Sequence, residues 1–123
     1  MNPGVAVRVA VIKELVSLSD GNGKSQDSLD RIIRKNRLND ADRGLATKLL
    51  YGSLRYAPGL FELVDAKLSR GIEKTDDRII WTLVVAEYQL RLLKRTPPHA
   101  VVSTAVDAAR KLAGNKAAKV VNA

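Results

Sequence analysis

Cysteine is absent from this sequence of 123 residues, and histidine occurs once, at His99. A chain without cysteine cannot form disulfides, thiolate metal sites or thiol nucleophiles. The sequence also lacks a glycine-rich phosphate loop, a nucleophile elbow and a carboxylate pair placed beside a partner base. His99 follows Pro97 and Pro98, where a helix is expected to begin, which favours a structural hydrogen bond over catalysis. We therefore expect no catalytic residue, no metal and no cofactor in this chain.

Long apolar runs are also missing. No stretch reaches the roughly 18 uninterrupted apolar residues that a membrane-spanning helix needs. The first residues, Met1 to Gly4, lack the charged and apolar regions of a signal peptide. These two absences predict a protein that stays in the cytoplasm and does not engage a membrane.

Aromatic residues make up only 4% of the chain. All of them stand within apolar helical patterns, so we expect them in the core rather than on a platform that stacks bases. A nucleic acid would then be bound through its backbone and shape. The aromatic residues are Tyr51, Tyr56, Phe61, Trp81 and Tyr88.

Positive charge is abundant. Lys and Arg number 21 against 13 Asp and Glu, which gives a formal charge of +8 and favours a polyanionic partner. Residues 31–55 hold seven basic residues and two acidic ones, and residues 91–119 hold seven basic residues and one acidic one. Solvated helix faces would explain any single Lys or Arg, but two clusters of one sign on a small domain indicate an electrostatic binding surface.

Apolar residues recur at helical spacing along most of the chain, and no alternation typical of strands appears. The pattern predicts one all-α domain over residues 1–123, a bundle of about six or seven helices. Ser25 is expected to cap the second helix, Asn39 the third, and Thr75 with Asp76 and Asp77 to open the fifth. The expected helices cover about 5–16, 25–35, 41–56, 60–68, 79–93, 98–112 and 116–123.

The third expected helix, ended by Pro58 and Gly59, contains a glycine in its apolar stripe of Leu45, Leu49, Gly52 and Tyr56. Glycine costs about 1 kcal/mol of helix propensity relative to alanine, which the close packing of a neighbouring helix would explain. Segment 79–93 is apolar nearly all round and is expected to form the central helix of the core.

Residues 42–55, DRGLATKLLYGSLR, closely resemble the DRALATELVYGTLR signature of NusB-like domains. Residues 88–90 and 96–106 resemble the family's LYQLL and VPPHAAVNEAV stretches, and residues 121–123 resemble its terminal FVNAVLR. The resemblance covers almost the whole chain. Within this family, the sequence resembles the N-terminal domain of the RsmB (Sun/Fmu) ribosomal RNA cytosine-C5 methyltransferases more than it resembles the free-standing NusB factor.

This resemblance implies a NusB-like helical bundle that binds RNA, with ribosomal RNA as the expected target, and that contacts its own methyltransferase domain downstream. The S-adenosylmethionine pocket and the cysteine nucleophile of the family lie in that downstream domain, so the chain would be a fragment that binds without methylating. Ser103-Thr104 stands where the family has Asn-Glu, and Val120 stands where NusB carries an aromatic residue near its RNA. The expected RNA-binding residues are Arg8, Arg31, Arg34, Lys35, Arg37, Lys116 and Lys119.

Two other functions stay open. One is a free-standing NusB-type antitermination factor that binds RNA and a protein partner. The other is a protein-interaction module whose basic surface contacts acidic proteins. Failure to bind RNA at low salt would favour the interaction module.

Overall fold

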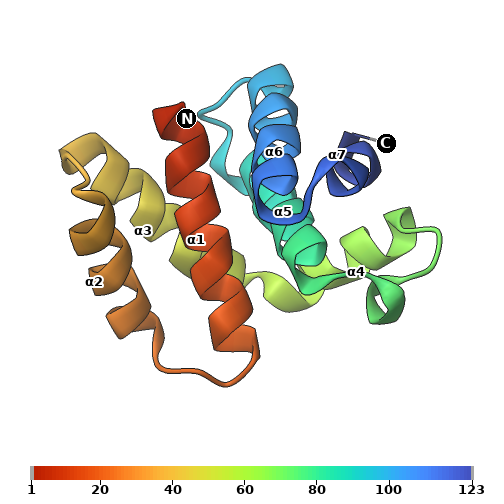
Figure 1. Cartoon of the computed structure of the whole chain (residues 1–123), viewed down its shortest axis with the longest axis horizontal. Helices are drawn as coiled ribbons and strands as arrows, with labels where there is room; N and C mark the ends of the chain where they lie inside the picture. Colours follow the sequence, from red (N-terminus) through yellow and green to blue (C-terminus); the bar gives the residue numbers. More distant parts are fainter. Residues whose placement is uncertain (1, 123) are drawn as a thin grey trace.

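The computed structural model describes residues 2–122, with the side chain of Pro3 left aside, and all of its regular structure is helical (Figure 1). The prediction of an all-α bundle is confirmed for this part of the chain, which holds seven α-helices. The last residue of the seventh expected helix, Ala123, lies outside the described residues. The elements are α1 (Pro3–Ser19), α2 (Ser25–Asn36), α3 (Asp40–Arg55), α4 (Ala57–Lys67), the 3₁₀ turn η1 (Ile72–Lys74), α5 (Asp77–Tyr88), the π-helical turn η2 (Gln89–Leu93), α6 (Pro98–Ala113) and α7 (Asn115–Asn122).

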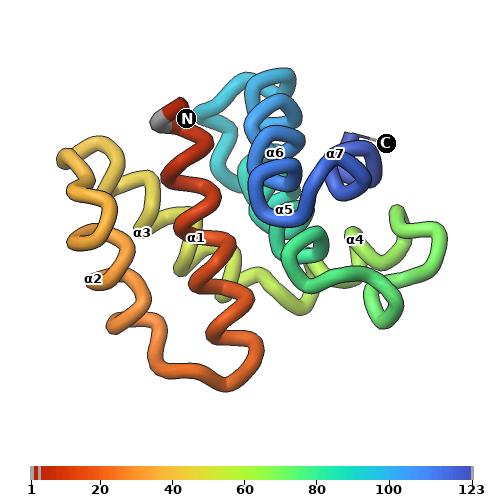
Figure 2. Tube along the Cα trace, viewed as in Figure 1, coloured from red at the N-terminus to blue at the C-terminus, as the bar shows by residue number. Residues whose placement is uncertain are grey.

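Helix α5 is the central element of the bundle and packs against α1, α3, α4, α6 and α7. Helices α1 and α6 lie side by side in front of it, while α2 and α7 lie at opposite ends of the long axis (Figures 1 and 2). As predicted for segment 79–93, Val84, Val85 and Tyr88 are buried. The segment differs from the prediction at its end, where the α-helix gives way to η2 and Leu92 is 48% exposed.

The helix boundaries follow local sequence signals with two corrections. The Asn39 side chain accepts a hydrogen bond from the Asp42 amide at 2.9 Å, so the predicted cap of α3 is confirmed. Ser25 does not cap α2, because it is already the first helical residue and Lys24 stands before it without a capping side chain. Pro58-Gly59 does not end α3 but lies in the first turn of α4, where a proline needs no amide partner.

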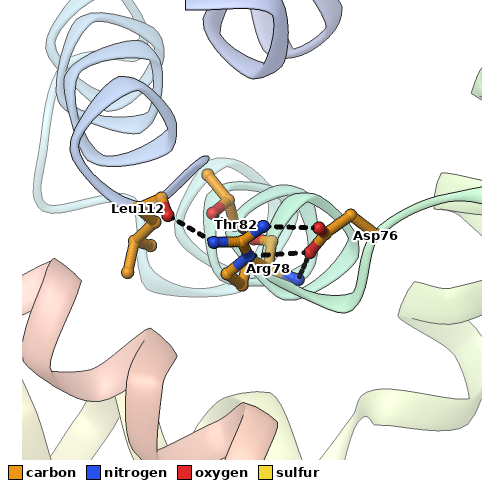
Figure 3. A network of polar contacts seen from close by, with 4 residues as sticks. All are labelled: Asp76, Arg78, Thr82 and Leu112. Atoms are coloured by element: carbon orange, nitrogen blue, oxygen red, sulfur yellow. Dashed lines mark hydrogen bonds and ion pairs between the residues drawn. The ribbon is translucent and has the colours of Figure 1, made fainter. Parts of the chain in front are cut away.

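The N-terminus of α5 is joined to the C-terminus of α6 by one arginine (Figure 3). Asp76 caps α5 by accepting a hydrogen bond from the Arg78 amide at 2.8 Å. The Arg78 guanidinium returns to the same carboxylate at 2.7 Å and also donates to the Leu112 carbonyl at 2.7 Å. The hydrogen bond from Arg78 lowers the pKa of Asp76. Arg78 therefore satisfies a carbonyl that the end of α6 leaves without a helical partner.

Helices α3 and α5 approach each other closely at Gly52. A Cβ atom built on Gly52 would lie 2.1 Å from Cζ of the Tyr88 ring, so the ring occupies the space of the missing side chain. The close packing predicted from the glycine is thus confirmed. Tyr56, expected to be buried in the same stripe, is 42% exposed and stacks on Tyr88 with ring centroids 6.3 Å apart.

We predict that Gly52→Ala lowers the free energy of unfolding by about 1–3 kcal/mol, because the added methyl group must displace the Tyr88 ring. Gly44→Ala in the same helix is the matched control, since nothing lies within 4 Å of a Cβ at that position. The control should gain up to about 1 kcal/mol from helix propensity alone. Urea unfolding of both variants measures the difference, and a Gly52→Ala protein as stable as the Gly44→Ala protein would contradict the close packing of Tyr88 on Gly52.

Candidate nucleic-acid interface

The basic residues of α2 are exposed and lie at one end of the molecule (Figure 1). Arg34 and Lys35 form no ion pair with a described residue, and Arg37 follows the helix as its left-handed C-cap with φ of 50°. Arg31 is different because it forms two hydrogen bonds of 3.0 Å to the carboxylate of Glu14 on α1. These bonds lower the pKa of Glu14, so the carboxylate stays ionised and offsets part of the Arg31 charge.

Lys116 and Lys119 are exposed on α7, which packs on α6 and α5 at the opposite end of the long axis (Figure 1). Helix α2 instead packs on α1 and α3. The basic residues of α2 and those of α7 therefore do not adjoin each other. A continuous basic surface between α2 and α7 would have to run over α1 and α6.

Arg8 is buried, with an exposed fraction of 6%. Its Nε and Nη2 atoms donate to Oε1 of Gln89 at 3.1 and 2.7 Å, and Nη1 donates to the Gly4 carbonyl at 3.0 Å. The Gln89 amide in turn donates to the Val85 carbonyl at 3.0 Å. Burial lowers the pKa of Arg8. The guanidinium is thus occupied by the fold, and Arg8 is not part of the candidate surface.

Lys13 of α1, which the sequence pattern did not single out, lies between the basic residues of α2 and those of α6. It lines a hollow of about 150 Å³ between α1 and α2 together with Arg31 and Lys35. It also lines a second hollow, of about 390 Å³, between α1 and α6 together with Arg78 and Lys111. We call Lys13, Arg31, Lys35 and Lys111 the basic band. It crosses α2, α1 and α6 on one face of the molecule.

The signal for Lys13 was present in the sequence. Residues 5–18 carry only three charged side chains, and two of them, Lys13 and Glu14, are adjacent and fall outside the apolar pattern, which marks the open side of this helix. Lys111 belonged to the second basic cluster but could not be placed without knowing how α6 lies against α1.

Aromatic side chains take no part in the two hollows of the basic band. Trp81 and Tyr88 are buried, as expected, whereas the exposed Tyr56 has the Arg55 guanidinium 5.5 Å from its ring centroid. His99 is exposed and makes no side-chain hydrogen bond with another described residue, so the expected structural hydrogen bond is absent. The band therefore offers cations to phosphates without stacking bases.

Residues 2–122 contain no group of three or more side chains able to hold a metal ion. None of the helices described is both long enough and apolar enough to cross a membrane.

These features define a small all-helical domain with a basic face. Residues 6–123 match the NusB family, and the chain belongs to that family. It is 32% identical, over all of its 123 residues, to the ribosomal RNA small subunit methyltransferase B of Pseudomonas syringae pv. tomato. It is 30% identical over 111 residues, 90% of the chain, to a Bacillus subtilis protein named "Probable ribosomal RNA small subunit methyltransferase B".

The chain spans only about a quarter of these relatives, 26% and 24% of their lengths. Among solved structures, it superimposes with a TM-score of 0.86 on a chain of a crystal structure of the antitermination factors NusB and NusE in complex with dsRNA. That match covers 99% of this chain and 92% of the other at 21% identity, so it establishes the fold alone. A chain from the crystal structure of a plectonemic RNA supercoil superimposes similarly, with a TM-score of 0.88 at 20% identity.

We predict that Arg8→Met lowers the free energy of unfolding by about 1–3 kcal/mol, because Oε1 of Gln89 is left buried without a donor. Lys13→Met, an exposed change in the same helix, should stay within about 0.5 kcal/mol of the parent protein. Urea unfolding compares the two. If Arg8→Met instead left stability unchanged and reduced the salt dependence of RNA binding, Arg8 would be a phosphate ligand and not a structural residue.

Proposed function

We propose that this chain is the RNA-binding N-terminal domain of a ribosomal RNA cytosine-C5 methyltransferase. The observation that carries the proposal is the basic band, formed on a NusB-family fold. The relatives named ribosomal RNA small subunit methyltransferase B support ribosomal RNA as the target, and the proposal includes the cytoplasm as the compartment. In this proposal the domain holds the RNA, while S-adenosylmethionine and the methyl transfer belong to a separate domain of the enzyme.

The band binds RNA through phosphate oxygens. Lys13, Lys35 and Lys111 are long cations without ion pairs among the described residues, and they follow one path over three helices. Each phosphate contact releases counterions, so affinity falls as salt rises. Cations that lie along a path contact successive phosphates of one strand, and such contacts fix the position of an RNA without reading its sequence. Arg34 on α2 and Arg37 at its C-cap would extend the proposed surface, and Lys116 with Lys119 would extend it along α7.

A free-standing antitermination factor is the alternative. The likeness to the NusB chain is at 21% identity and concerns the fold, while the two methyltransferase relatives are 30% and 32% identical to this chain. This difference in identity favours the methyltransferase domain.

We predict that Lys13→Gln with Lys35→Gln weakens binding to a structured ribosomal RNA fragment and to an unrelated RNA alike. The slope of log K against log salt should flatten by about 0.7–0.9 for each phosphate that the variant no longer binds. The matched control is Arg70→Gln with Lys74→Gln, which removes two exposed cations outside the band and should leave the slope unchanged. Lys116→Gln with Lys119→Gln measures whether the α7 cluster takes part.

Fluorescence anisotropy across a salt series gives these slopes. An unchanged slope for the Lys13 and Lys35 pair would exclude the band as the phosphate site. Absence of binding by the parent protein at low salt would remove the RNA function altogether and leave the protein-interaction module in its place.

A further inference from the structure

A groove of about 670 Å³ lies between the end of α4, η1, α5, α6 and α7. Its floor is a stripe along one side of α5 and η2, made of Ile79, Leu83, Ala86 and Leu90. Ala105 of α6 and Val121 of α7 add to the apolar lining. None of these residues belongs to the basic band.

The groove is the one side of α5 that the described chain does not cover. Ile79, Leu83 and Leu90 are only half-buried, although the sequence makes this helix apolar on nearly every side. The rim adds two exposed apolar side chains, Val102 at 40% and Val120 at 43%. An apolar stripe that remains open between an apolar rim on α6 and α7 and a polar rim on α4 and η1 is typical of a protein-docking site.

Some of the charged residues around the groove form ion pairs and others do not. The Glu87 carboxylate is ion-paired with Lys67 and, at 2.7 Å, with Arg91, so its single negative charge is shared between two cations. Burial alone would raise the pKa of Glu87, but the hydrogen bonds from Lys67 and Arg91 outweigh it and the pKa is lowered. Asp76 is paired with Arg78 at 2.7 Å.

Arg70 and Lys74, on the same rim, form no ion pair with a described residue. Among the residues that line the groove, the charge without an ion pair is therefore positive, and it lies on the side of α4 and η1. A partner that fits must bring apolar side chains for the floor and carboxylates for this rim.

Two other occupants fit less well. RNA would find an apolar floor and no aromatic side chain among the lining residues on which to stack a base. A second copy of this chain would bring a further net charge of +8 to a rim that is already positive.

We propose that the groove binds an acidic amphipathic helix of a protein partner. The floor runs from Ile79 to Leu90, about 16 Å along the helix axis, which matches about three turns of a docked helix. Apolar residues of the partner at i, i+3, i+4 and i+7 lie on the stripe of α5, and carboxylates on its flank face Arg70 and Lys74. This inference does not depend on RNA binding.

The test uses two synthetic helical peptides of about 16 residues with the same leucine pattern. One carries glutamates on its flank and the other carries lysines at the same positions. The glutamate peptide should bind the 123-residue protein at least about tenfold more tightly than the lysine peptide. Amide chemical-shift changes should map to Leu83, Val102 and Val120.

Two double variants separate the apolar from the charged contribution. Val102→Gln with Val120→Gln should weaken both peptides by about tenfold, and both positions are exposed enough for the fold to persist, which thermal melts verify. Arg70→Glu with Lys74→Glu should reverse the preference so that the lysine peptide binds better. Arg34→Glu with Lys35→Glu on α2 is the matched control and should preserve the preference.

Equal affinity for the two peptides, or a reversal caused by the α2 control pair as well, would overturn the proposal because the charge on the rim would then not select the partner. Loss of RNA binding in the Val102 and Val120 variant would make RNA the occupant instead. A dimer in sedimentation equilibrium that this variant dissociates would make a second copy the occupant. RNA binding that fails while the peptide results stand would refute only the proposed function.

Discussion

The contact between the Tyr88 ring and the backbone of Gly52 sets how closely α3 and α5 pack, and the rest of the bundle is arranged around that distance. The residues on either side of Tyr88 connect α5 to two further helices. Glu87 forms the ion pair with Lys67 on α4, and Gln89 holds the guanidinium of Arg8 on α1. Three consecutive residues thus join the central helix to α4, α3 and α1. A change in the distance between α3 and α5 would therefore displace all three of these contacts together.

These connections also explain why parts of the fold could be predicted from the sequence. The helix-capping role of Asn39 and the packing role of Gly52 depend on residues within one turn or on the absence of a side chain, and both are visible locally. Glu87 and Gln89 interrupt the apolar pattern of segment 79–93. They are buried because Lys67 of α4 and Arg8 of α1 are their partners, and the sequence pattern of one segment carries no information about partners on other helices.

The candidate site was less accessible to sequence reasoning for the same physical reason. Arg8 is separated from Gln89 by 81 positions in the chain, so a basic residue near the N-terminus gave no sign that it would be buried. Lys13 became part of the basic band only through the way α1 lies between α2 and α6. Composition and charge clustering identified a basic domain, but the path that its exposed cations follow depends on how the helices cross.

Helix α7 forms one wall of the groove and is held mainly by small side chains. Its contacts with α6 involve Ala117 and Val121 against Ala105 and Ala109, in a cluster apart from the main core. Methyl groups bury little apolar area for each residue, so each of these contacts contributes little free energy by itself. Because they form a cluster apart from the main core, a displacement of α7 would change the width of the groove and leave the main core closed.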